Sequence, residues 1–192
     1  MVRIIIAKGL AAFGSVPCCL YANNFAGAIV PLDPGSDMHP RTEDFLEIVK
    51  REFDFEPNVK TFAEGTKTAE DAAAAIGCEV DHIAASIVVD TDDGLAVVVT
   101  SGANRVDMNR VATLLDCTDA TMADPAKIRE TLGWSIGGVP PFCHDTDVPV
   151  LVDDTLFSYE TVWAAAGTPQ SVFPIDPDSL LDYSNGQRAV IT

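Results

Sequence analysis

The segment 135–144, Ser-Ile-Gly-Gly-Val-Pro-Pro-Phe-Cys-His, holds residue types that can present backbone groups to a ligand. Gly137 and Gly138 lack a Cβ, so a ligand can approach their backbone closely. Pro140 and Pro141 fix φ and remove two N–H donors, which makes the loop stiff. The remaining N–H groups can then be held ready for a carbonyl or phosphate oxygen. The alternative is a rigid connection that only turns the backbone, because Gly and Pro are common in loops.

Three side chains, those of Cys143, His144 and Ser86, are weaker candidates for a functional role. Cys143 and His144 are neighbours in sequence, and neighbours in extended backbone point to opposite faces, so the two do not readily pair. Because a thiolate nucleophile needs a partner that lowers its pKa, a thiol-dependent enzyme is the weakest alternative. We expect His144 at the rim of a pocket or hydrogen-bonded within the loop, and not as a general base. The Ser86 hydroxyl either binds substrate or caps the end of a strand.

Several common sites find no match in the sequence. The segment Gly65–Thr68 lacks the earlier glycine of a phosphate-binding loop, and no GxSxG motif occurs. The three histidines are scattered and the five cysteines form no CxxC, so we predict no metal. An odd cysteine number without framework spacing favours a reducing cytoplasm over a disulfide scaffold. No apolar run reaches the length of about 18 residues that a membrane helix needs. Asp153 and Asp154 are expected to cap a turn or short helix.

The charge balance restricts the partners. The 192 residues include 12 Lys and Arg against 29 Asp and Glu, for a net charge of −17. This excludes a broad basic surface for duplex DNA or for anionic lipid, although a small basic pocket is still possible. The composition, with 20 Asp and only 5 Lys, resembles that of salt-adapted proteins. A hydrophobic content of 47% excludes wholesale disorder, and the length suits one domain.

The N-terminal segment differs from the rest of the protein. Within residues 1–37 the charges of Arg3, Lys8 and two aspartates sum to zero, so residues 38–192 carry the whole −17. A signal peptide, an extra strand and a tail are the three interpretations, and Lys8 interrupts the signal-like apolar stretch. We predict an N-terminal extension, 1–37, outside the fold, which a start codon placed upstream of Met38 would explain, and a single domain at 38–192.

Apolar periodicity and turn residues predict a mixed α+β domain. Helices are expected after Thr42 as cap, at 69–76, around 106–115, at 125–133 and at 177–183. Strands are expected at 59–62, 83–89, 95–99, 148–152, 161–165, 171–175 and 188–191, with a hairpin turn at 90–94. Because helices and strands do not alternate strictly, α+β is favoured over a doubly wound sheet.

Seven motifs, in this order, resemble one known family: Thr66–Ala73, Ile83–Val88, Thr100–Asp107, Ala123–Pro125, Gly137–Phe142, Pro149–Asp153 and Ala165–Pro169. They resemble the YbaK family of aminoacyl-tRNA deacylases, which is related to the editing domain inserted in bacterial prolyl-tRNA synthetases. The resemblance covers residues 42–192. It implies a mixed, mostly antiparallel β-sheet curled into a partial barrel with surrounding helices.

The resemblance also implies an activity and a site. Family members hydrolyse the ester of mischarged tRNA without a metal or cofactor, and a terminal tRNA hydroxyl helps to activate water. The expected carbonyl-positioning loop is Gly137, Gly138, Val139, Pro140 and Pro141. The expected substrate-binding residues are Ser86, Ser101, Phe142, His144, Gly167 and Thr168, with Phe142 or Trp134 as a stacking surface for the single-stranded 3′ end unless these rings belong to the core. We expect a cytoplasmic monomer that binds aminoacyl-tRNA and neither DNA nor membrane.

Three departures from the family keep an alternative open. Ala85 stands where family members commonly carry Lys, Cys143 replaces a usual glycine, and no histidine lies near 167–171. Lys67 and Arg105 either supply charge from neighbouring segments or are solvated surface groups. The alternative function is a non-catalytic module that binds aminoacyl-tRNA or a small acyl ligand in the same pocket.

Overall fold

The computed structural model describes residues 38–62 and 68–192, so the predicted extension at 1–37 and Lys67 lie outside the described residues. Within these ranges the strands are β1 (Lys60–Thr61), β2 (Ile83–Thr91), β3 (Gly94–Ser101), β4 (Ala120–Met122), β5 (Val150–Asp153), β6 (Val162–Ala165), β7 (Ser171–Ile175) and β8 (Gln187–Ala189). The helices are α1 (Pro40–Phe53), α2 (Ala69–Ile76), α3 (Met108–Leu114), α4 (Pro125–Leu132) and α5 (Pro177–Ser184), with short 3₁₀ turns at Val80–His82 and Asp154–Ser158.

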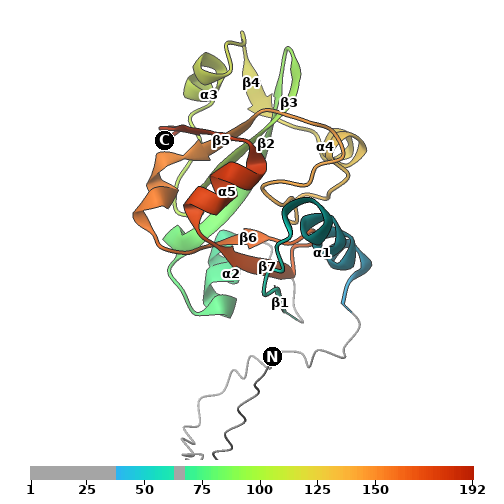
Figure 1. Ribbon diagram of the computed structural model, residues 1–192. Helices are drawn as coiled ribbons and strands as arrows, with labels where there is room; N and C mark the ends of the chain where they lie inside the picture. Colours follow the sequence, from blue (N-terminus) through green and yellow to red (C-terminus); the bar gives the residue numbers. More distant parts are fainter. Residues whose placement is uncertain (1–37, 63–67) are drawn as a thin grey trace, which may run out of the picture.

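These strands form one mixed sheet in the order β1-β7-β6-β2-β3-β5-β8, with β4 paired to β2 off this path (Figure 1). The β2–β3 hairpin carries the longest register, from Ala84↔Ser101 to Thr91↔Gly94. The β1–β7, β6–β7 and β2–β4 pairs are also antiparallel, whereas β2–β6, β3–β5 and β5–β8 are parallel. The sheet stays open, with β1 and β8 at the ends of the order. The predicted α+β class and mostly antiparallel partial barrel are confirmed.

Local capping explains where most helices begin and end. Thr68 caps α2 in a reciprocal capping box with Asp71, and Gly77 closes that helix in the left-handed conformation at φ +82°. Asp124 caps α4 ahead of a proline at its first position. The prediction for Thr42 is wrong: α1 begins earlier, with His39 as the cap. Thr42 is instead fully buried, and its Oγ1 donates to Ser171 Oγ at 3.0 Å.

Two main apolar clusters cover the faces of the sheet, and a third, small cluster packs α2 against Ile83. The larger one packs α1, α4 and α5 against β2, β3 and β7, with an aromatic group of Phe45, Phe142 and Phe173 at its centre. The second main cluster packs α3 against the opposite face, around Val98 and Val111. Among the described residues, no helix is long and apolar enough to cross a membrane.

Candidate functional site

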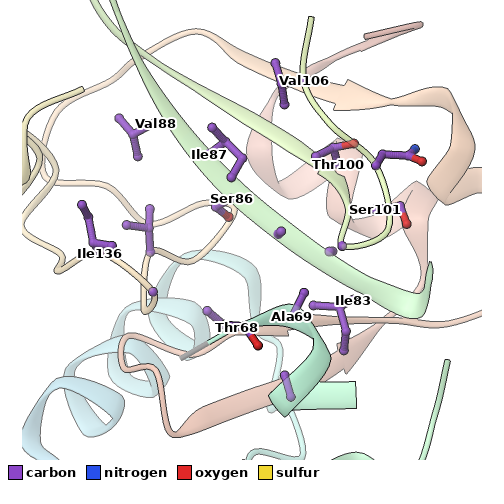
Figure 2. A pocket seen from close by; sticks show the side chains of 18 of the residues that line it. Thr68, Ala69, Ile83, Ser86, Ile87, Val88, Thr100, Ser101, Val106 and Ile136 are labelled. Carbon is purple, nitrogen blue, oxygen red and sulfur yellow. The ribbon is translucent and has the colours of Figure 1, made fainter. Parts of the chain in front are cut away.

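A cavity of about 550 Å³ lies against β2 at a break in its pairing (Figure 2). On the edge of β2 that faces away from β3, β6 pairs only with Ile83 and Ala84, and β4 pairs only from Val89 onward. The stretch 85–88 between them has no strand neighbour on this side among the described residues, and it lines the cavity. The cavity therefore occupies a place where the sheet lacks a strand.

The alternation of backbone hydrogen bonds between β2 and β3 decides which backbone groups of β2 face the gap. Gly102 N donates to Ile83 O at 2.8 Å, and antiparallel pairs alternate, so Ile83, Ala85 and Ile87 direct their N–H and C=O groups to β3. The residues between them point to the other side, as the bond from Ala123 N to Val88 O at 3.1 Å confirms. Ser86 thus turns its N–H and C=O toward the gap, where neither β4 nor β6 reaches them.

The side chain of Ser86 is also available. Its Oγ is buried and has no hydrogen-bond partner among the described residues. In Figure 2 the side chain lies between β2 and the loop that carries Ile136. A buried hydroxyl without a partner is costly, because its desolvation is not offset by a hydrogen bond. A bound polar group would supply the missing bond.

The glycine–proline loop forms the opposite wall through a tight turn. Gly138 N donates to Ser135 O at 3.0 Å, and Gly137 has φ +83°, as a type II turn requires at its third residue. The Gly138 N–H is therefore used within the loop. Gly137 and Val139 both line the cavity, and their N–H groups have no hydrogen-bond partner in the described residues. These two N–H groups are candidate donors to a substrate oxygen.

The loop is held rigidly from behind. A Cβ on Gly138 would lie 2.6 Å from Thr168 Cα, so the two backbones touch. A Cβ on Gly167 would lie 2.7 Å from Arg41 O, and Gly167 has φ +86°. His144 Nε2 donates to Pro140 O at 2.9 Å. Burial lowers the pKa of His144, so the ring is neutral at pH 7.

The predicted site residues divide into two groups. Gly137, Val139, Ser86 and Ser101 line the cavity, whereas the others are not among its lining residues: Gly138, Pro140, Pro141, Phe142, His144, Gly167 and Thr168. Phe142 is 2% exposed and packs in the aromatic core, and Trp134 is equally buried, so the core interpretation holds for both rings. The Ser101 hydroxyl donates to Asp81 O at 3.1 Å and accepts from Ala103 N at 3.3 Å.

Sequence reasoning missed a polar network beside the cavity. Asp153 is fully buried, and its Oδ2 accepts from Thr100 Oγ1 at 2.7 Å, Thr155 Oγ1 at 2.8 Å and Asn104 Nδ2 at 3.1 Å. Thr100 and Asn104 line the cavity. Asp153 makes no side-chain cap to the 3₁₀ turn that follows it, so the expected capping role is wrong. The available signal was an aspartate at the end of an otherwise apolar strand.

The ionisable groups near the loop limit its chemistry. Burial raises the pKa of Cys143 to about 12, so this thiol stays protonated, and its φ of +65° matches a position where a glycine would fit without strain. Arg105 is the only ionisable residue among the described residues that line the cavity. Within the described ranges, no group of three or more His, Cys, Asp or Glu side chains could hold a metal ion.

Several known proteins with similar sequences or structures have names that refer to the editing or deacylation of aminoacyl-tRNA. A family model described as "Aminoacyl-tRNA editing domain" matches residues 63–183. YwhH of Bacillus subtilis (strain 168) is 31% identical over 130 residues, which are 67% of this chain and 82% of YwhH. The "Putative Cys-tRNA(Pro)/Cys-tRNA(Cys) deacylase EbsC" of Enterococcus faecalis (strain ATCC 700802 / V583) is 25% identical over 68% of this chain and 80% of its own. A solved structure of "a putative trans-editing enzyme for prolyl tRNA synthetase" superposes with a TM-score of 0.77 at 33% identity, covering 81% of this chain and 99% of that one.

Proposed function

Since the chain belongs to the aminoacyl-tRNA editing domain family, we propose that it is a free-standing deacylase that hydrolyses the ester of mischarged tRNA. Water adds to the ester carbonyl, the carbonyl–ribose C–O bond breaks, and the ribose oxygen takes the proton. The products are the free amino acid and intact tRNA. The observation that carries the proposal is the pair of free N–H groups, on Gly137 and Val139, at the wall of the cavity.

These N–H groups stabilise the oxyanion that forms when water adds to the carbonyl. Each well-placed donor of this kind contributes about 3–4 kcal/mol to the transition state. The packing of Gly138 against Thr168 holds the loop in place before the substrate arrives, so little reorganisation is needed. Pro140 and Pro141 serve the same purpose by fixing the backbone that follows. The loop from Gly137 to Pro141 acts in this way as the carbonyl-positioning element.

The other wall binds the rest of the aminoacyl end. The hydroxyl and the backbone carbonyl oxygen of Ser86 accept hydrogen bonds from the α-ammonium group of the bound amino acid. The amino acid then lies in the gap beside β2, between β6 and β4. Because no described lining residue except Arg105 is ionisable, and a guanidinium does not act as a base at neutral pH, the neighbouring ribose hydroxyl orients the attacking water. The reaction needs no metal or cofactor in this scheme. Ser101 contributes by stabilising the turn after β3, where its hydroxyl bonds to Ala103 N, and not by contacting the substrate.

The same scheme defines partner and location. The partner is the single-stranded 3′ end of aminoacyl-tRNA, and the place of action is the cytoplasm, where tRNA is charged. We expect a monomer. Phe142 and Trp134 are buried and do not stack on bases in this scheme.

The test measures amino acid release from a panel of mischarged tRNAs. Gly137→Ala should lower kcat/KM on the order of 10²-fold, because the strained φ and a Cβ at 3.3 Å from Pro169 Cγ displace the loop donors. Gly77→Ala is the matched control, since Gly77 also has φ +82° but a Cβ there meets nothing within 4 Å. Release by the wild type no faster than by Gly137→Ala would end the proposal.

The binding-module alternative makes a different prediction for the same panel. It predicts saturable binding of aminoacyl-tRNA with no loss of the ester. The feature that favours it is Ala85, at a position where a lysine is common in the family. Under this alternative Ala85→Lys creates an activity that the wild type lacks.

A further inference from the structure

The cavity carries a single charged side chain within the described residues, Arg105 in the turn between β3 and α3. Its side chain is exposed, so the guanidinium reaches solvent at the edge of the cavity. The other described lining residues are neutral, and most are small or apolar. A lone positive charge here is notable, because the protein as a whole carries −17.

Among the described residues, Arg105 also differs from most basic side chains in having no carboxylate partner. Of the nine Lys and Arg side chains in the described ranges, six lie within ion-pair distance of an acidic group: Arg41, Lys50, Arg51, Arg110, Lys127 and Arg188. The nearby Asp107 pairs with Arg110 at 3.9 Å and caps α3. The guanidinium of Arg105 makes no ion pair or side-chain hydrogen bond with the described residues, so its five donors are free for a ligand.

The backbone on both sides of Arg105 is anchored. Asn104 Nδ2 donates to Asp153 Oδ2 at 3.1 Å and to Thr155 Oγ1 at 3.0 Å, and Asn104 N donates to Ser101 O at 2.9 Å. On the other side, Asp107 N donates to Ile191 O at 3.1 Å. The buried Asp153 thus fixes the point from which the Arg105 side chain starts. A guanidinium on a fixed base loses less entropy on binding than one on a mobile loop.

We propose that Arg105 binds the phosphodiester group of the 3′-terminal nucleotide of the tRNA, and this rests on the deacylase function proposed above. In an aminoacyl-tRNA, only the terminal ribose separates that phosphate from the ester. An ester seated between the Gly137 loop and Ser86 therefore brings the phosphate to the edge of the same cavity. The planar guanidinium matches two phosphate oxygens and keeps its charge at every relevant pH. Arg105 is a substrate-positioning residue that acts on binding, not on the chemical step.

The first experiment compares Arg105→Gln with the control Arg129→Gln. Arg129 is an exposed arginine of α4 that lacks an ion pair among the described residues and does not line the cavity. For aminoacyl-tRNA, Arg105→Gln should raise KM at least about 10-fold, the loss of one charge-assisted contact, with kcat nearly unchanged. Arg129→Gln should leave both constants unchanged. Arg105→Lys should recover part of the loss. With 3′-aminoacyl-adenosine, which carries no phosphate, wild type and Arg105→Gln should have equal KM values.

The second experiment measures binding alone, so that it does not depend on catalysis. The probe is a short single-stranded RNA with the 3′-terminal sequence of a tRNA and no amino acid. Replacing its last phosphodiester by an uncharged methylphosphonate should weaken binding to wild type and to Arg129→Gln, but not to Arg105→Gln. The same weakening in all three proteins would overturn the Arg105 proposal. If the wild type releases no amino acid and this selective pattern persists, the deacylase function fails while the phosphate contact stands.

Discussion

The Ser86 hydroxyl is buried and has no hydrogen-bond partner among the described residues, so its removal should affect stability and activity in opposite directions. Ser86→Ala removes an unsatisfied polar atom from the free protein, so the free energy of unfolding should rise by about 1 kcal/mol. The same change removes a bond to the substrate, so kcat/KM should fall roughly 10-fold. Chemical denaturation and amino acid release measure the two effects on the same samples. Function and stability conflict at this residue.

Ser101→Ala is the matched control, because the Ser101 hydroxyl is fully used, donating to Asp81 O and accepting from Ala103 N. Its removal should lower stability by about 1 kcal/mol, the opposite sign to Ser86→Ala. Ser86→Ala losing stability together with activity would instead assign the Ser86 hydroxyl to the fold.

His144 connects loop stability to pH. Burial lowers the pKa of His144 in the folded protein below its ordinary value of 6.5. As pH falls through 6.5 the unfolded state therefore takes up a proton first, so the contribution of His144 to stability is complete above pH 6.5 and declines below it. His144→Gln does not titrate. The stability difference, wild type minus His144→Gln, should accordingly be largest near about pH 7.5 and shrink toward about pH 5.

Denaturant titrations of both proteins at each pH give that difference directly, and the subtraction cancels the titration of the shared carboxylates. A difference that stays constant with pH would mean that the His144 ring is equally solvated in the folded and unfolded states.

At the scale of elements, local signals were sufficient where a helix is capped by its own sequence. The Thr68 capping box and the Asp124-Pro125 start act within a few residues, so both helix starts could be predicted. Thr42 misled the prediction because it resembles a cap, yet Pro40 already begins α1 and the Thr42 hydroxyl bonds to Ser171, far along the sequence. β4 was missed because three residues are too short to show a period.

In the candidate site, too, features set by the local sequence could be predicted and those set by distant contacts could not. The stiffness of the glycine–proline loop follows from its residue types, but the sequence does not show which N–H groups stay free, since Gly138 N is used within the loop. The cavity could not, since it exists only where β4 and β6 leave part of β2 unpaired. Nor could the sequence show that Asp153 gathers Asn104 and two threonines, which are brought together by the parallel β3–β5 pairing.

The Asp153 network predicts an unusually costly substitution. Asp153→Ala leaves Thr100 Oγ1 and Thr155 Oγ1 without their acceptor and removes one of the two acceptors of Asn104 Nδ2, so it should cost at least about 3 kcal/mol of unfolding free energy. The neighbouring Asp154 makes an exposed ion pair with Arg188, and Asp154→Ala should cost less than about 1 kcal/mol. Denaturant unfolding compares them, and similar losses would show that the Asp153 bonds contribute little beyond a surface pair.

For the whole molecule, acidic charge opposes the proposed substrate. The ion pairs among the described residues all join partly exposed side chains, which stabilise little, and the net charge stays at −17. tRNA is a polyanion, so at low salt it is repelled before Arg105 can contact it. The screening length falls from about 10 Å at 0.1 M salt to about 3 Å at 1 M, which removes most of this repulsion.

Salt should therefore accelerate the reaction with tRNA and not with an uncharged substrate. Between about 0.1 M and 1 M KCl, kcat/KM for aminoacyl-tRNA should rise, because weaker repulsion allows faster association. For 3′-aminoacyl-adenosine, which carries no phosphate, kcat/KM should stay nearly constant over the same range. Thermal unfolding should shift to higher temperature as the carboxylates are screened. If KCl slowed the tRNA reaction instead, attraction by a local basic surface would outweigh the net negative charge, and the acidic composition would not govern how this protein meets its substrate.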